Sequence, residues 1–456
     1  MRHRPAITPT APPAEPLFFE PELEMSNAHP FRALRAKPLW IANGVIMGFV
    51  AVLFTVFYVG ANLDPAGHLH KLPVALVSAD KGASVGRQAD QPRSADRPVD
   101  REVVRGWRQD RLEVMDEKEM KEELGEGKLF GALVVPRDFT SAVAALPSPK
   151  AADNAVRPTL TVLTNQSAGS MGSGMALQAT RAAAESASAQ VGKELTAQAQ
   201  AAKAKPSPAA LMVLADPAAV HVEDGHPLDS HTGMGLSAFY YSLVLVVCGM
   251  LAANVISGQV DHALGYTHSD IGPRRTQNPL LRATRVQTLA ISSTLMIGLS
   301  LLMGSLVLAG AVGVMGMDAA HLPLLWLFSV STIAVVGIGG LGLLAAFGTP
   351  GMLFITMFYI AMAVPTSGAT VPLQALPDFY RVLGEFEPLR QITDAVRSIL
   401  YYDAQGDAGL TRGWVMLGVG LAVACLFGFG MTWFYDRKGL HRIPADEEPE
   451  RTLTRV

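Results

Sequence analysis

"LLWLFSVSTIAVVGIGGLGLLAAF", residues Leu324–Phe347, contains no charged side chain over a length that can cross a bilayer. A transmembrane helix needs about 20 mostly apolar residues, because the hydrocarbon core is about 30 Å thick and each helical residue rises about 1.5 Å. A surface helix of a soluble protein would instead show a polar face. The stretch therefore predicts an integral membrane protein.

Five further segments have the same character, and none carries a charged residue in its core. They are Leu39–Gly60, Leu236–Ile256, Leu289–Met315, Gly351–Val364 and Trp414–Phe434. Pro350 and Pro365 bracket the short segment Gly351–Val364, so a broken or re-entrant segment is the alternative to a full span there. We predict an α-helical membrane protein with about six transmembrane helices, arranged as one plus five.

The overall composition agrees with a membrane protein and argues against a nucleic-acid-binding protein. Only 17% of the 456 residues are charged, whereas soluble proteins usually have about a quarter. The net charge of -3 offers no strongly basic surface, so we expect no nucleic-acid partner. Both cysteines, Cys248 and Cys425, fall in predicted spans, which leaves the region between the first two spans without a disulfide.

Positive charges orient the spans. Arg32, Arg35 and Lys37 precede the first span, four arginines lie within residues 274–285 between the second and third, and three basic residues follow the last within 437–442. Six spans place all three groups on one side, which the positive-inside rule makes the cytoplasm. We predict a multi-pass plasma-membrane protein with both termini cytoplasmic and the large domain outside.

The domain boundaries follow from the spans. We predict a mostly disordered cytoplasmic segment (1–38), a first transmembrane helix (39–60), an inserted extracytoplasmic α/β domain (61–235), a five-helix membrane domain (236–435) and a cytoplasmic tail (436–456). A cleaved signal peptide is the competing interpretation of the first span, although the apolar run is longer than in a usual signal. Met25 is an alternative start site.

The α/β prediction for residues 61–235 depends on alternating patterns. Short β-type runs occur at Leu72–Asp80, Arg111–Asp116, Leu129–Pro136 and Leu160–Asn165. Helix-type patterns separate them, and such alternation is typical of a layered α/β structure. Residues 167–205 are rich in Ala, Ser and Gln with poor apolar spacing, which favours a long, polar, solvated helix.

Several common motifs for self-contained catalysis are missing from the sequence. It has no G-x-x-x-x-G-K-[ST], CxxC or HExxH pattern, and we expect no enzyme activity, no catalytic residue and no cofactor. Histidines and carboxylates gather in residues 221–231, and His68 and His70 lie at the other end of the predicted domain. Their spacing matches no known ligand pattern, so solvated juxtamembrane residues are favoured over a metal site.

The predicted spans contain neutral polar and small residues instead of ionisable ones. An ion-driven antiporter usually places an acid or histidine at membrane depth, so this mechanism is disfavoured. Asn254, Ser292 and Ser293, with Gly337 and Gly340 of "GIGGLG", are candidates for a transport pathway or for helix packing. Small residues four apart suit close packing within the bundle, or a homodimer face as the alternative.

A charged stretch, "PLQALPDFYRVLGEFEPLRQITDAVRSILYY" (372–402), separates the last two predicted spans. Its apolar residues recur at helical spacing, and Pro388 interrupts any continuous helix. We predict two amphipathic helices at the outer membrane surface, with Pro377, Phe386, Pro388 and Arg397 as their marker residues. Arg397 is interpreted as an interface anchor rather than a contact to cargo.

Several of these stretches carry a family resemblance. "LPVALVSADKGA" (72–83), "DRLEVMDEKEMKEELGEGKLFGALVVPRDFT" (110–140) and "PLRQITDAVRSIL" (388–400) resemble the YhgE/phage-infection-protein (Pip) family. That family is related to fungal nitrosoguanidine-resistance type proteins and resembles type-2 ABC transporter permeases. In such permeases a cytoplasmic helix between the second and third spans contacts a separate ATPase. Asp261 and Gly265 are the closest equivalents in this chain.

The resemblance implies a function in export. We expect a permease-like component that exports a hydrophobic, toxic or envelope-related compound, as in multidrug resistance. Its expected partners are the lipid bilayer, a second copy in a homodimer and a separate ATP-hydrolysing subunit. The alternative is a non-transporting surface protein, of the secretion-system or phage-receptor type, whose outer domain binds a partner.

Overall fold

The computed structural model describes residues 37–80, 112–146, 157–201, 208–271, 274–440 and 442. The chain divides into two compact units, residues 1–53 and 54–456. The first unit contains most of helix α1 (Lys37–Phe54). The predicted N-terminal segment with Arg32 and Arg35, and the tail beyond residue 442, lie outside the described residues.

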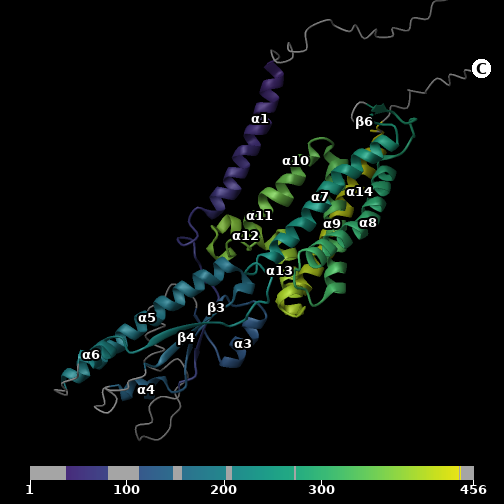
Figure 1. Cartoon of the computed structure of the whole chain (residues 1–456). Helices are drawn as coiled ribbons and strands as arrows, with labels where there is room; N and C mark the ends of the chain where they lie inside the picture. Colours follow the sequence, from purple (N-terminus) through teal and green to yellow (C-terminus); the bar gives the residue numbers. More distant parts are fainter. Residues whose placement is uncertain are drawn as a thin grey trace, which may run out of the picture. The chain divides into compact units, whose positions relative to one another are not determined.

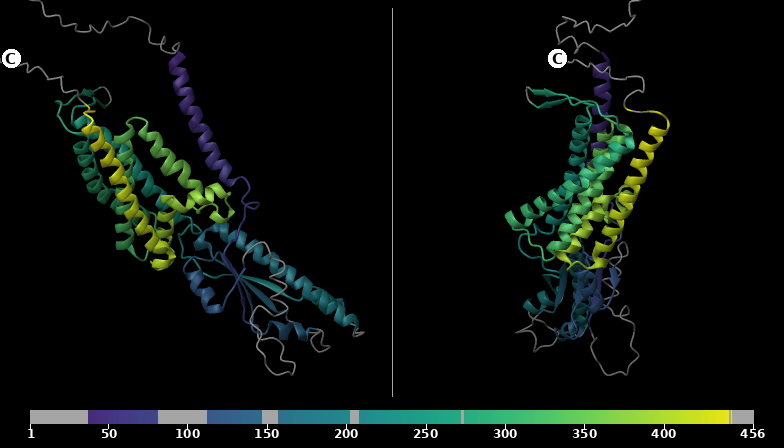
Figure 2. Two further views of the ribbon diagram at one scale, coloured as in Figure 1. Left: turned by 180° about the vertical axis from the view of Figure 1, so that it is seen from behind. Right: turned by 90° about the vertical axis from the view of Figure 1, so that its right-hand side faces the viewer.

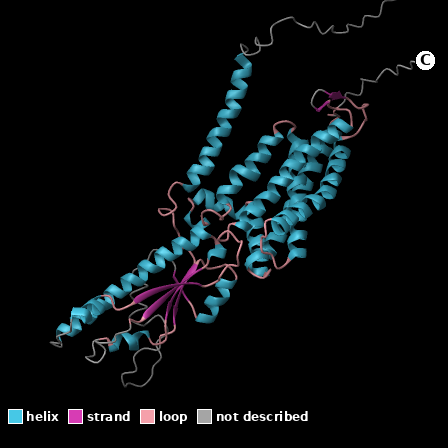
Figure 3. Cartoon of the chain, viewed as in Figure 1, coloured by secondary structure: helices cyan, strands magenta, loops and turns pink. Residues whose placement is uncertain are grey.

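The second unit is mostly helical (Figure 3). Among the residues that the structure describes, four helices are long and apolar enough to cross a membrane: α7 (Ser237–Ala263), α8 (Arg285–Leu308) with its π-helical extension η5 (Ala309–Val314), α9 (Leu322–Phe347), and η8 (Gly406–Leu410) continued by α14 (Thr411–Arg437). They lie side by side in all three views (Figures 1 and 2). These helices confirm the predicted apolar spans at 236–256, 289–315, 324–347 and 414–434.

Two further apolar helices are shorter. One is the apolar stretch Gly44–Gly60, which comprises the greater part of α1 and the π-helical η2 (Thr55–Gly60) that continues it. The other, Gly351–Thr366, comprises α10 (Gly351–Thr356), η6 (Met357–Met362) and α11 (Ala363–Thr366). Because of their length, the total of six spans stays a prediction. A small antiparallel hairpin, β6 (Ser269–Ile271) and β7 (Arg274–Thr276), connects α7 to α8.

Small residues set how closely the long helices approach one another. A methyl group on Gly249 of α7 would lie 2.9 Å from the carbonyl oxygen of Ile333 on α9. One on Gly340 of α9 would lie 2.9 Å from the Cβ of Ala253 on α7. Glycine therefore permits the α7–α9 contact, which agrees with helix packing, one of the two roles predicted for Gly340.

A five-stranded mixed sheet is built from residues 74 to 224. Its strand order is β2 (Leu112–Val114), β1 (Val74–Ser78), β3 (Gly131–Val135), β4 (Thr159–Thr164) and β5 (Ala219–Asp224). All neighbouring pairs are parallel except β3 and β4, which place Leu133 opposite Val162. The first four strands match the predicted runs, whereas β5 was not predicted. Most of its polar sequence, "AVHVED", lies within the residues that had been interpreted as solvated and juxtamembrane.

Helices cover both faces of this sheet. Side chains alternate along β1, so Ala75 and Val77 pack with α3 (Glu117–Gly125) on one face, while Leu76 joins the core on the other. That second core contains side chains of α4 (Phe139–Ala145), α5 (Ser170–Ala201) and α6 (Pro208–Ala215). Figure 1 shows α5 running alongside the strands.

The interpretation of residues 167–205 as a solvated helix was wrong. After a 3-10 turn, η4 (Gln166–Ala168), the long helix α5 buries a stripe of small residues against the sheet. The stripe includes Ala183, Ala184 and Ala187. Alanine and serine can line a close helix–sheet contact, although they give only a weak apolar pattern in the sequence.

The predicted interruption at Pro388 is confirmed. The 3-10 turn η7 (Leu373–Ala375) leads to α12 (Asp378–Phe386), and α13 (Pro388–Tyr401) begins at the proline. Helix α12 exposes Phe379, Val382 and Phe386, as a helix at a lipid surface would. Helix α13 is different, because its apolar residues Leu389, Ile392 and Val396 are buried in the same core as α7 and α9.

Candidate functional site

Glu387 is the N-cap residue of α13, directly before Pro388. Its carboxylate accepts hydrogen bonds from the backbone N–H groups of Leu389 at 2.9 Å and Arg390 at 3.0 Å. Such an N-cap satisfies donors that would otherwise have no partner inside the helix. Glu387 is nevertheless only 3% exposed, and burial raises its pKa to about 7, against the opposing effects of the two N–H donors and the Arg390 charge.

Charged side chains at helical spacing follow Glu387 along α13. Asp394 lies 3.6 Å from Arg390 Nε and 3.5 Å from Arg397 Nη1, so one carboxylate serves two guanidinium groups. Both distances are longer than a strong ionic hydrogen bond. Burial lowers the pKa of Arg390, an effect that Asp394 opposes and the nearby Arg412 and Arg397 strengthen. The row carries more positive than negative charge.

Arg397 is the most buried member of this row, at 6% exposed. Its Nε and Nη2 atoms have no hydrogen-bond partner. A methyl group built on Gly169, in the loop after β4, would lie 3.5 Å from Nη2. The interface-anchor role of Arg397 stays a prediction, but its side chain is buried in the protein. The guanidinium group lies beneath a loop of the sheet, where an incompletely paired charge is costly.

A cavity of about 560 Å³ opens beside this row. We call it the arginine cavity. Its lining includes Arg390, Asp394 and Arg397 of α13 and Arg412 at the start of α14. Residues 126–128 between α3 and β3 and residues 367–374 complete the wall. The cavity therefore lies where the sheet meets one end of the helical bundle.

The last residues of α13 join the sheet region to the bundle. The hydroxyl of Tyr401 bonds Ser237 Oγ at 2.7 Å and accepts from the N–H of Ala238 at 3.1 Å, while its carbonyl oxygen lies 2.8 Å from His226 Nε2. A methyl group on Gly127 would lie 2.7 Å from the ring of Tyr402. Strands and spans thus meet around α13.

Buried polar atoms collect near this joint. The side-chain oxygens of Asn165, Ser167 and Tyr402 are buried, and Ser167 and Asn165 lie close enough to Tyr402 to interact with its hydroxyl. Burial raises the pKa of Tyr402, whereas the positive charge of Arg397 opposes this. The hydroxyl of Tyr402 therefore stays neutral at physiological pH and can donate a hydrogen bond.

A second cavity of about 480 Å³ lies between the helices of the bundle. We call it the apolar cavity. Its walls are α9, residues 354–359, the start of α13 and residues 413–427 of α14, with Phe386 from α12. Gln391 is the polar side chain that α13 contributes, and its Oε1 atom has no partner. The cavity therefore suits the apolar portion of a ligand.

The predicted pathway residues do not form one site. Asn254 is exposed on α7, whereas Ser292 and Ser293 are buried on α8. Ser292 lines a space of about 20 Å³, enough for roughly one water molecule. Gly337 packs against Met296 of α8, since a methyl group there would lie 2.3 Å from its sulfur atom. A pathway role for these residues stays a prediction.

The predicted outer-helix residues have separate roles in the structure. Pro377 precedes α12, Phe386 ends that helix and is exposed, and Pro388 begins α13. Only Arg397 lines the arginine cavity, and Phe386 and Pro388 line the apolar cavity. Residues of helix α13 therefore line both cavities.

The residues predicted for ATPase coupling lie at the C-terminal end of α7. Asp261 forms an ion pair with Arg442. Gly265 has a positive φ of 77°, and a methyl group there would lie 2.7 Å from the carbonyl oxygen of Pro279. Asp261 therefore links the end of α7 to the segment after α14, whereas Gly265 shapes the turn between α7 and α8. Contact with a second protein remains a prediction.

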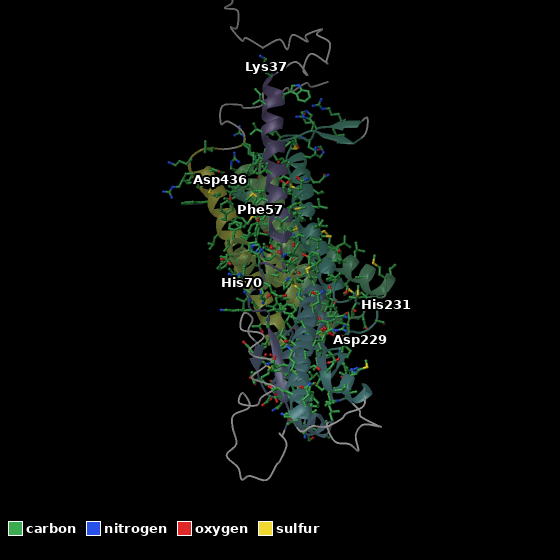
Figure 4. The ribbon with its side chains drawn as sticks, turned by 90° about the vertical axis from the view of Figure 1, so that its left-hand side faces the viewer. Lys37, Phe57, His70, Asp229, His231 and Asp436 are labelled. Atoms are coloured by element: carbon green, nitrogen blue, oxygen red, sulfur yellow. The ribbon has the colours of Figure 1, made fainter. Side chains whose placement is uncertain are left out.

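The histidine-rich segments do not gather into a metal site. Figure 4 shows His70 and His231 on opposite sides of the view, with Asp229 near His231. Within the described ranges, no three His, Cys, Asp or Glu residues lie close enough together to hold a metal ion. His221 instead lies 3.0 Å from Glu223 on β5.

Sequence reasoning missed the N-cap residue of α13 and several residues of the arginine cavity. Glu387, Arg390, Asp394, Tyr402 and Arg412 were not singled out. Arg390, Asp394 and Arg397 are spaced i, i+4 and i+7, which places them on one helix face. This spacing was a usable signal, although the sequence alone did not show that the sheet covers that face.

The four long apolar helices, the sheet and the buried joint between them define a membrane protein with an additional strand-containing region. The chain belongs to the DUF3533 family, described as "Protein of unknown function", whose pattern matches residues 43–420. It is also 24% identical over 232 residues to the "Uncharacterized protein YhgE" of Bacillus subtilis (strain 168). That match spans 49% of this chain and 26% of the relative. No solved structure matches.

Proposed function

We propose that the chain is the membrane component of an exporter that moves an amphipathic compound out across the plasma membrane. The apolar cavity is the observation that supports this most strongly. Its volume of about 480 Å³ lies in the range of about 300–1,000 Å³ found for small-molecule sites. Two of its walls are α9 and α14, helices that can cross a bilayer, where a hydrophobic, toxic or envelope-related compound would partition.

The proposed orientation places the sheet outside the cell. Arg285, Arg437, Lys438 and Arg442 belong to one end of the bundle, where Arg285 Nε bonds the carbonyl oxygen of Leu440 at 2.7 Å. The positive-inside rule favours the cytoplasm for this end. The sheet joins the bundle at the other end, through Tyr401.

The proposed partners rest on the resemblance to type-2 ABC permeases. We propose a homodimer energised by a separate ATP-hydrolysing subunit, which would contact the turn around Asp261 and Gly265. The chain itself would carry out no catalytic step. The apolar side chains exposed on α8 and α14, including Leu302, Leu306 and Leu426, are available to lipid or to a second copy.

Two tryptophan substitutions on α14 test the proposal. Val423 lines the apolar cavity and is 59% exposed, so Val423→Trp can fill the space without displacing a buried core. Leu426→Trp is the matched control, because Leu426 is exposed on the same helix outside the lining. The readout is ATP-dependent accumulation of labelled amphiphiles in inverted membrane vesicles containing equal amounts of each variant.

We expect Val423→Trp to lower the initial rate to a small fraction of that of the wild type, and Leu426→Trp to leave it unchanged. Equal rates in all three would show that cargo does not pass through the apolar cavity. Partner binding that is retained when residues 61–235 are displayed on an unrelated anchor, without any accumulation by the full chain, would favour the surface-interaction alternative.

A further inference from the structure

We propose that the arginine cavity binds the phosphate group of an anionic lipid headgroup. The inference requires that the chain lies in a bilayer, but not that it transports anything. It rests on three features of the cavity: the charge of its lining, the unpaired nitrogen atoms of a buried arginine, and its position at one end of the bundle.

The lining has an excess of positive charge. Lys128 and Glu126 form an ion pair with each other, which leaves three arginines to be balanced by Asp394 and Asp407. Asp394 is divided between two guanidinium groups at 3.5 and 3.6 Å. A phosphate group matches the planar donor fork of arginine and would supply the missing negative charge.

Arg397 provides the observation that points to a ligand. It is buried, it lines the cavity, and both Nε and Nη2 are without a partner. These two atoms form one edge of the guanidinium fork, the edge used in bidentate binding of an oxyanion. A small rotation of the side chain toward the cavity would present this edge to a phosphate.

Neighbouring arginines are held loosely and can also turn toward the ligand. Arg390 Nη1 donates to the carbonyl oxygen of Gly384 at 3.4 Å, and Arg412 Nη2 donates to that of Glu385 at 3.4 Å. These hydrogen bonds are long and therefore weak. Their replacement by charge-assisted bonds to phosphate would be favourable.

The position of the cavity favours a lipid as the source of the phosphate. Arg412 lies in the first turn of α14, a helix long enough to cross a bilayer, so the cavity lies near one membrane surface. Next to it, α12 exposes Phe379, Val382 and Phe386. Apolar side chains beside a basic cavity suit the boundary at which lipid chains meet headgroups.

The test uses the full chain in neutral detergent, titrated with phosphatidylglycerol, phosphatidylcholine or inorganic phosphate. Binding is followed through the rise in unfolding temperature. The variants are Arg397→Gln and Arg412→Gln in the cavity, with Arg381→Gln as the matched control. Arg381 lies on α12 outside the cavity lining and pairs with Asp378 at 2.6 Å.

We expect wild type and Arg381→Gln to bind phosphatidylglycerol equally well, and phosphatidylcholine more weakly. Arg397→Gln should weaken phosphatidylglycerol binding by about tenfold or more, the usual cost of losing a charged hydrogen-bond donor. Arg412→Gln should weaken it severalfold. Since Arg412 is exposed, its variant keeps the test valid if Arg397→Gln does not fold.

Equal affinity for the neutral and anionic lipids, or unchanged binding in both cavity variants, would overturn the proposal. Arginine-dependent binding of inorganic phosphate with the same affinity as the lipid would support the phosphate site but identify a soluble source. If the wild-type chain bound phosphatidylglycerol through these arginines but transported no amphiphile, only the export proposal would be contradicted. The two proposals can therefore fail separately.

Discussion

Replacing Glu387 by Gln should remove a pH dependence from the stability of this protein. Glu387 is 3% exposed, and its carboxylate has two backbone N–H donors as partners at 2.9 and 3.0 Å. Burial raises its pKa from 4.5 to about 7. Glutamine retains the shape of the side chain and one acceptor oxygen, but it cannot ionise.

The size and sign of the effect follow from proton linkage. Between pH 4.5 and about 7, the folded chain holds a proton on Glu387 that the unfolded chain has lost. The free energy of unfolding is therefore not reduced by Glu387 below pH 4.5, and it decreases as the pH rises through 7. At about 1.4 kcal/mol per unit of pKa, the total decrease is about 3 kcal/mol.

Thermal unfolding of the full chain in mild detergent, from pH 5 to pH 8, measures this decrease. The wild type should lose several degrees relative to Glu387→Gln over that interval. Glu385→Gln is the matched control, because Glu385 is exposed and lies two residues earlier. It should follow the wild type. Parallel pH profiles for wild type and Glu387→Gln would refute the reasoning.

Two further changes test the packing of the fold. Gly249→Leu should lower the free energy of unfolding by about 1–3 kcal/mol, because the new side chain would collide with the backbone of Ile333 on α9. Gly258→Leu is the control and should not destabilise the protein, because a methyl group on Gly258 meets nothing within 4 Å. Asn165→Ala should cost about 1–3 kcal/mol, since its buried Nδ2 donates to two backbone carbonyl oxygens at 3.0 and 2.9 Å. Asn278→Ala, at an exposed site, should change little, and unfolding temperatures in detergent check both pairs.

The parts of the fold that could be predicted are those with strong local signals. Apolar length alone identified the four long helices, because the bilayer imposes a minimum length on any spanning segment. Alternation and turn residues identified strands β1 to β4. Pro388 marked the break between α12 and α13, because proline lacks the N–H that a helix interior needs.

The parts that could not be predicted depend on contacts between distant segments. Helix α13 was expected at a membrane surface, but Gly127 packs against Tyr402 and Gly169 lies over Arg397. Nothing in residues 388–401 shows that a loop more than 200 positions earlier will cover them. Strand β5 was missed for a similar reason, since it is defined by pairing with β4 rather than by its own polar sequence.

The most direct test of the proposed export function is a measurement of transport by the intact chain. Inverted membrane vesicles from cells with and without the chain are given ATP and a labelled anionic amphiphile, and its accumulation is followed over time. We predict ATP-dependent accumulation only in vesicles that contain the chain. Equal accumulation in both preparations, across a panel of amphiphiles and with the chain present in the membrane, would contradict the proposed export function.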